Sequence, residues 1–75
     1  MGRKDGIMKK RIEELGYDIS DRAEWVREGS DFDEECQKAT DEIADNLEIE
    51  RNYENEDYVA INEWVNEQMT EYLEQ

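Results

Sequence analysis

Residues 30–50 read SDFDEECQKATDEIADNLEIE, and apolar residues return in this stretch every three or four positions. At about 100° per residue, such spacing predicts an amphipathic α-helix. The apolar side chains on one side of that helix are Phe32, Cys36, Ala39, Ile43 and Leu47. The carboxylates almost opposite them are Glu34, Asp41, Asp45 and Glu48. The stretch therefore predicts one long helix with a core face and an acidic face.

The same apolar spacing recurs before and after this stretch, and glycine marks the ends of two further helices. Gly16 and Gly29 each follow a helix-like pattern, where a left-handed C-terminal cap is expected. Ser20 is the expected N-cap of the second helix, and Asn55 or Asp57 is expected to open the last. The expected helices cover about residues 7–15, 21–28, 31–49 and 56–74. No alternating strand pattern appears, so we expect an all-α fold, a small bundle of three to four helices.

The chain has 75 residues and a formal net charge of −14, from 23 acidic and 9 basic residues. This length suits one small domain with a modest core. The charge is uneven, because residues 1–11 hold five basic residues and one aspartate, which is +4 and leaves −18 on the other 64 residues. We expect a single acidic helical domain over residues 1–75, in which residues 1–6 form a flexible basic N-terminus.

Residues 56–74 repeat the division into two faces. The side chains expected to face inward are Tyr58, Ile61, Val65, Met69 and Tyr72. Those expected to face outward are Glu56, Glu63, Glu67 and Glu74. From Glu54 onward there are seven acidic residues and no basic one, so the outer carboxylates lack the i,i+4 partners that support exposed helices.

The charge density of the first acidic helix can be compared with that of DNA. From Glu28 to Glu50 there are ten acidic residues and one lysine, a net −9 over about 34 Å of helix at roughly 1.5 Å per residue. One charge per about 4 Å approaches the one phosphate per roughly 3.4 Å of a DNA strand. A protein that grips DNA would meet a similar field here.

The residue inventory argues against an enzyme. The chain has no histidine, which is the usual general base and a common ligand of transition metals. Cys36 lies on the apolar face, with no cationic neighbour to lower its pKa and no second cysteine for an intramolecular disulfide. We therefore expect no catalytic residue, no cofactor and no metal ion.

Calcium binding needs separate consideration. Asp31, Asp33, Glu35 and Glu42 occupy positions 1, 3, 5 and 12 of an EF-hand loop, but Cys36 stands at position 6, where the sharp turn needs glycine. The helical pattern across the same residues also argues against such a loop. No apolar run is long enough for a membrane span or a signal peptide, so we expect a cytoplasmic protein without membrane contact.

The two tryptophans and the basic segment leave alternatives open. Trp25 and Trp64 lie off the centre of their inward faces, either as lids on a small core or as anchors of an interface. A homodimer through residues 56–74 would extend the core if the acidic side pointed outward. Direct binding of nucleic acid is not expected, because the exposed face of residues 31–49 is acidic. Lys9, Lys10 and Arg11 are instead expected to lie against the domain's own acidic surface or to extend into solvent.

In size, charge and helix-borne carboxylates, residues 28–75 resemble the small acidic DNA-mimic inhibitors of phages and mobile elements, which include anti-CRISPR and anti-restriction proteins. The resemblance implies a non-enzymatic inhibitor whose carboxylates occupy the Arg and Lys positions of a basic nucleic-acid-binding protein, such as a CRISPR effector. The basic N-terminal segment departs from a uniformly acidic mimic. The alternative is a small helical interaction module, antitoxin-like or a regulatory adaptor, which binds through Trp25, Trp64 and the apolar edge of residues 56–74.

Overall fold

A computed structural model describes residues 3–74 of the chain, with side chains from residue 6 onward. Within that range the backbone forms four helices and no strand, so the all-α bundle is confirmed. The helices are α1 (Arg3–Leu15), α2 (Ser20–Arg27), α3 (Phe32–Asn46) and α4 (Glu56–Leu73). Of the expected flexible N-terminus, residues 1–2 lie outside the described residues, and helix α1 begins earlier than the expected residue 7.

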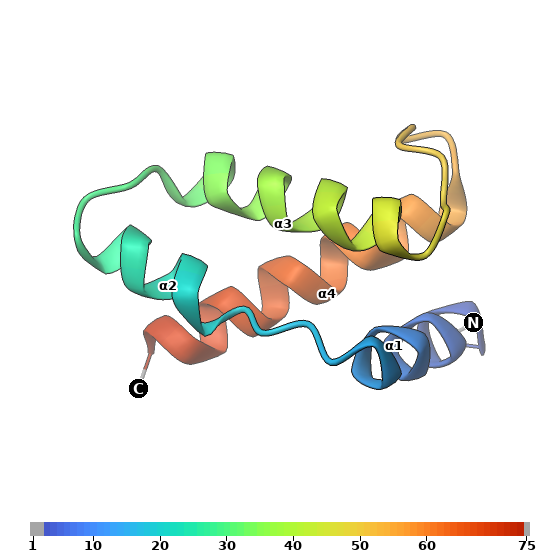
Figure 1. The fold of residues 1–75 in the computed structure, drawn as a ribbon, viewed down its shortest axis with the longest axis horizontal. Coiled ribbons are helices and arrows are strands. Elements are labelled where there is room, and N and C mark those ends of the chain that lie inside the picture. The colour runs from blue at the N-terminus through green and yellow to red at the C-terminus, as the bar shows by residue number, and fades with distance from the viewer. Residues whose placement is uncertain (1–2, 75) are drawn as a thin grey trace.

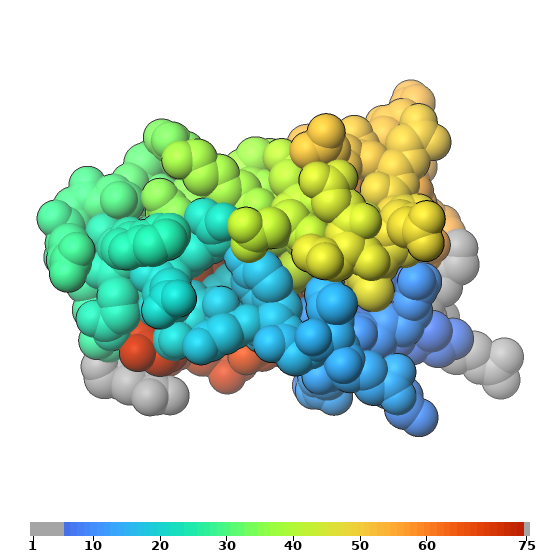
Figure 2. All heavy atoms as spheres, in the orientation of Figure 1, coloured from blue at the N-terminus to red at the C-terminus, as the bar shows by residue number. Residues whose placement is uncertain are grey.

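Helix α4 is the element that holds the bundle together. It packs against each of the other three helices, and α2 also packs against α3. Figure 1 shows α1 beside the N-terminal half of α4 and α2 beside its C-terminal half, with α3 across both. The loop from α3 to α4, yellow to orange in Figure 2, projects at one end of the molecule. None of the helices described between residues 3 and 74 is long and apolar enough to cross a bilayer.

The core contains one inward face from each helix. Its buried apolar residues are Met8, Ile12, Ala23, Cys36, Ala39, Ile43, Ala44, Tyr58, Ala60, Ile61, Val65 and Met69. The expected inward faces of α3 and α4 are thus confirmed, with Phe32, Leu47 and Tyr72 partly buried at their edges. Leu15, which its spacing from Met8 and Ile12 would place on the inward side, is the last residue of α1 and is 36% exposed.

Glycine ends α1 and α2 as expected, whereas α3 ends without it. Gly16 and Gly29 have positive φ angles of 77° and 122°. After α3, Glu48 takes the same left-handed position with φ 58°, and the Ile49 amide donates to the Ala44 carbonyl at 2.8 Å. This bond and a 3.2 Å bond from the Glu48 amide to Asp45 form a Schellman motif. Helix α3 therefore ends at Asn46, and the expected end near residue 49 was wrong.

The expected helix starts hold for α4 but not for α2. Asn55 is the N-cap of α4, and its side-chain oxygen accepts a hydrogen bond from the Asp57 amide at 3.0 Å. Ser20 is not the N-cap of α2 but its first residue. The Asp18 carboxylate accepts hydrogen bonds from the Ser20 amide at 2.9 Å and the Ser20 hydroxyl at 2.6 Å. The aspartate two residues earlier thus satisfies the amide, and the serine side chain is held by it.

Candidate acidic interface

The four carboxylates predicted to face outward lie on α4 and at its C-cap, and we call them the α4 row: Glu56, Glu63 and Glu67 on the helix, and Glu74 at the C-cap. All four are exposed. They point outward because the opposite side of the helix buries Tyr58, Ile61, Val65 and Met69 against the other helices. Among the described side chains, neither Glu63 nor Glu67 has an ion pair. The α4 row is therefore a strip of carboxylates on a rigid helix.

The corresponding residues of α3 do not form such a strip. Asp41 is half-buried and accepts hydrogen bonds from the Tyr58 hydroxyl at 2.5 Å and the Gln37 amide at 3.1 Å. An isolated helical wheel places it outward, but the phenol of Tyr58 reaches it from α4. Glu48 lies beyond the end of α3, so its expected place on the outer side of that helix was wrong.

The other two carboxylates predicted on the outer side of α3 have basic neighbours. Glu34 pairs with Lys38 one turn later at 3.1 Å, and Asp45 pairs with Arg51 at 3.7 Å. Both pairs are exposed, where such contacts contribute little stability. Glu34 and Asp45 remain accessible, but part of their charge is balanced within the chain.

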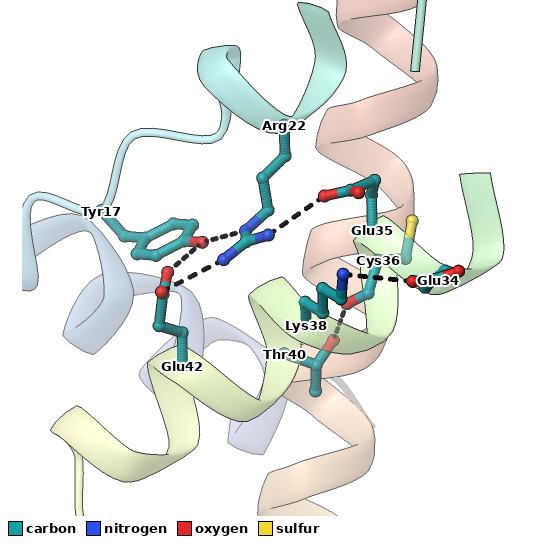
Figure 3. Close-up of polar contacts among 8 residues, drawn as sticks. All are labelled: Tyr17, Arg22, Glu34, Glu35, Cys36, Lys38, Thr40 and Glu42. Carbon is teal, nitrogen blue, oxygen red and sulfur yellow. Dashed lines mark hydrogen bonds and ion pairs between the residues drawn. The ribbon is translucent and has the colours of Figure 1, made fainter. Parts of the chain in front are cut away.

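A second group of carboxylates lies inside a polar network that we call the Arg22 cluster (Figure 3). Its members are Tyr17, Arg22, Glu35 and Glu42. The Arg22 guanidinium contacts Glu35 at 3.0 Å and Glu42 at 3.1 Å, and its Nε donates to the Tyr17 hydroxyl at 2.9 Å. The Tyr17 hydroxyl donates to Glu42 at 2.7 Å. The cluster joins the link after α1, helix α2 and helix α3.

The protonation states of this cluster follow from its geometry. Burial and the hydrogen bond to Glu42 raise the pKa of Tyr17 to about 12. The hydrogen bond from Tyr17 and the contacts with Arg22 lower the pKa of Glu42 against a smaller effect of burial. Burial lowers the pKa of Arg22, but its hydrogen bonds with Tyr17 and Glu42 raise it by more, so the net shift is upward. The cation of Arg22 and the ionised form of Glu42 are thus both stabilised, which suits a structural role rather than proton transfer.

Sequence reasoning missed the Arg22 cluster. Glu35 and Glu42 are seven residues apart and therefore share one side of α3, which was a usable signal. Arg22 is the residue before the buried Ala23 in α2, and its own side chain is only 13% exposed. Glu35 is only 6% exposed, and its burial depends on this arginine.

The two predicted aromatic anchors lie in different places. Trp25 is 46% exposed, and the Arg22 guanidinium lies 5.6 Å from its ring centre. Trp64 is half-buried and lines a hollow of about 140 Å³ beside α4. The residues that line the hollow are Lys9, Ala60, Glu63, Trp64, Glu67 and Gln68. Lys9 therefore lies near the acidic surface of its own domain, as expected.

Cys36 and the remaining acidic residues offer little for catalysis. Burial, followed by the charges of Asp33 and Glu35, raises the pKa of the Cys36 thiol to about 11. A thiol of this kind is protonated at neutral pH and a weak nucleophile. Asp33 and Glu35 belong to helix α3, which runs through the residues that an EF-hand loop would need. In the described part of the chain, no three acidic or cysteine side chains are arranged to hold a metal ion.

A second hollow, of about 220 Å³, lies between α3, α4 and the loop that joins them. Its lining is mostly polar and comprises Asp33, Cys36, Gln37, Tyr53, Asn62 and Asn66. The Tyr53 hydroxyl is bound to Gln37, so part of this lining is already hydrogen-bonded within the chain.

Comparison of the chain with protein-family models, with curated protein sequences and with solved structures finds no match. The functional reading of the α4 row therefore rests on its geometry and charge.

Proposed function

We propose that this protein is a non-enzymatic inhibitor that binds a basic nucleic-acid-binding protein and occupies the Arg and Lys side chains that would otherwise hold phosphates. The observation that carries the proposal is the α4 row, three exposed carboxylates on one helix and a fourth at its C-cap, in a segment without a basic residue. A net charge of −14 on a small domain would attract such a target over a distance and accelerate the encounter.

Helix α4 is the better mimic of a nucleic-acid strand. From Glu56 to Glu74 the row covers 18 residue steps, which is about 27 Å at roughly 1.5 Å per residue. Four carboxylates over that length correspond to about every second phosphate of a DNA strand. The charge of α3 is higher along the sequence, but Glu35 and Glu42 are bound to Arg22, and Asp41 is bound to Tyr58. These three carboxylates belong to the fold, so α3 has a supporting part in the proposed interface.

The proposed target is a bacterial defence effector, such as a CRISPR or restriction complex, and the proposed location is the cytoplasm of a phage-infected host. We propose the monomer as the binding form. A homodimer through the outer side of α4 would bring two α4 rows together and would be opposed by their like charges.

The test is capture from bacterial lysate with the purified protein as bait, at increasing salt and with added DNA as competitor. A triple variant, Glu63→Gln, Glu67→Gln and Glu74→Gln, is compared with a matched control, Glu13→Gln, Glu14→Gln and Glu28→Gln. Both triples remove three exposed carboxylates. We expect a nucleic-acid-binding complex that moderate salt and DNA release, and that only the α4 triple fails to capture. A partner that resists salt, ignores DNA and binds both triples equally would contradict mimicry.

The exposure of Trp25 supports a second candidate, the small helical interaction module. A tryptophan ring with almost half of its surface exposed can anchor a protein interface. In that case Trp25→Ala should abolish capture of the partner, while the α4 triple retains it. The two variants therefore separate the two functions in one experiment.

A further inference from the structure

We propose that the hollow beside Trp64 is the seat of one arginine side chain of the partner, stacked on the indole ring and bound by Glu63 and Glu67. This inference rests on the proposed function and names its central point of contact. Two residues of the α4 row, Glu63 and Glu67, line the hollow, and its volume of about 140 Å³ is several times the space that one water molecule needs.

The lining of the hollow matches a guanidinium. Glu63 and Glu67 are one helical turn apart and therefore stand on the same side of α4. A guanidinium is planar, binds carboxylates through two parallel hydrogen bonds and stacks on aromatic rings, of which tryptophan is the strongest partner. A lysine of the partner would meet the charge but would lack the planar contact.

The chain itself builds this arrangement twice with its own arginines. Arg22 lies 5.6 Å from the ring centre of Trp25 and contacts Glu35 and Glu42. Arg27 lies 5.1 Å from the ring centre of Tyr72 and contacts Glu24 at 3.3 Å.

The hollow is a third combination of this kind, a tryptophan ring beside two carboxylates. Among the described side chains no arginine lies on Trp64, whereas Trp25 and Tyr72 each have one. The missing component is the one that a basic partner would supply.

Removing the charge of Lys9 should have the opposite effect on arginine binding from removing the carboxylates. Lys9 lines the same hollow and has no ion pair with Glu63 or Glu67 within the described residues. Its ammonium group brings a like charge close to an incoming guanidinium. Removal of this charge should therefore strengthen binding of an arginine, while removal of the carboxylates should weaken it.

The experiment uses a hepta-arginine peptide as the probe and tryptophan fluorescence as the readout, in the full chain with Trp25→Phe so that Trp64 is the only reporter. We expect a saturable change at low salt. Glu63→Gln with Glu67→Gln should weaken binding about tenfold, and the charge-matched pair Glu13→Gln with Glu14→Gln about twofold. Lys9→Met should strengthen binding about twofold, and hepta-lysine should bind more weakly than hepta-arginine.

Two outcomes would overturn the seat. One is the absence of a saturable change at Trp64, and the other is an equal loss in the two charge-matched pairs, which would show that only net charge acts. Neither outcome touches the proposed function, because that is decided by the salt-released capture of a nucleic-acid-binding complex. Conversely, a lysate that yields no such complex would overturn mimicry even where the peptide binds at Trp64. Urea unfolding of each variant verifies that the fold is retained.

Discussion

The Arg22 cluster and the α4 row contain the same kind of side chain in opposite surroundings. Glu35 is 6% exposed and is bound by a guanidinium that also holds Glu42 and a tyrosine hydroxyl. Glu63 and Glu67 are exposed on a rigid helix and have no ion pair with a described side chain. The first group is committed to the fold, and the second is available to a partner.

The difference shows that the 23 acidic residues of the chain include some that stabilise the fold and others that lie exposed on its surface. A carboxylate near the core must be paired, because an isolated buried charge costs several kcal/mol. A carboxylate on the outer side of a helix needs no partner, but it adds repulsion to the folded state. The free energy of unfolding distinguishes the two groups. Loss of an ion pair in the Arg22 cluster should lower it, whereas loss of a charge in the α4 row should not.

The largest effect is expected for Arg22→Met. This change leaves Glu35 without its cation and should lower the free energy of unfolding by about 3 kcal/mol, at the lower end of the range for broken buried pairs. Urea unfolding at pH 7 measures the loss. The control is Lys38→Met, which breaks an exposed pair with Glu34 and should cost less than about 1 kcal/mol. Equal losses would show that the Arg22 cluster is no more important to the fold than a surface pair.

The second effect is a loss of stability at alkaline pH. The folded state raises the pKa of Tyr17 to about 12, because the phenol is buried and donates to Glu42. A folded pKa above the unfolded one gives stability that is complete below the ordinary value of about 10 and is lost as pH rises from there through 12. We expect Tyr17→Phe to show a flatter decline of the free energy of unfolding between pH 9 and 11.

The Tyr17→Phe variant should still lose some stability at alkaline pH. Burial and the hydrogen bond to Asp41 also raise the pKa of Tyr58 to about 12. A decline as steep in Tyr17→Phe as in the unchanged protein would contradict the assigned role of the Tyr17 hydroxyl.

The third change sharpens the comparison with a carboxylate that belongs to neither group. Glu48 has a left-handed backbone with φ 58°, which costs an ordinary residue about 1–2 kcal/mol. Glu48→Gly should therefore raise the free energy of unfolding by about 1 kcal/mol after the entropic cost of glycine. Glu48→Gln removes the charge without the strain and should change stability by less than about 0.5 kcal/mol. Equal gains from both substitutions would assign the cost of Glu48 to charge rather than backbone.

The periodicity of the sequence was sufficient for the helices and for their inward faces. Each apolar face is long enough to be read from 3.6-residue spacing, and Gly16 and Gly29 are informative because a positive φ favours glycine. The end of α3 could not be read in this way, since Glu48 takes the position that glycine usually fills. The N-cap of α2 was misplaced because the Asp18 carboxylate binds both the amide and the hydroxyl of Ser20, and the helix already begins at Ser20.

The candidate site was predictable in part. A single helix determines the α4 row, so a helical wheel is enough to find its four residues. The pairing of Asp41 with Tyr58 and the Arg22 cluster join different helices, and periodicity within one helix does not contain that information. The hollow beside Trp64 likewise depends on how α1 lies against α4, which brings Lys9 to Glu63.

The smallest effect is expected for the α4 row itself. Glu63→Gln with Glu67→Gln should leave the free energy of unfolding within about 0.5 kcal/mol of the original value or slightly raise it, because exposed carboxylates without partners contribute only repulsion. Added NaCl screens this repulsion, because the Debye length at 0.1 M is only about 10 Å. Salt should therefore stabilise the unchanged protein more than the variant. Urea unfolding at low and high NaCl measures both effects.

A loss of more than about 1 kcal/mol in this variant would place Glu63 and Glu67 among the residues that hold the fold, together with Glu35. The contrast between the two groups of carboxylates would then disappear. If the variant keeps its stability but no longer captures the partner, then Glu63 and Glu67 serve binding rather than folding. Binding would then account for carboxylates that only add repulsion to the folded state. Selection for folding alone would favour at least one basic residue among the seven acidic residues from Glu54 onward, and the chain has none.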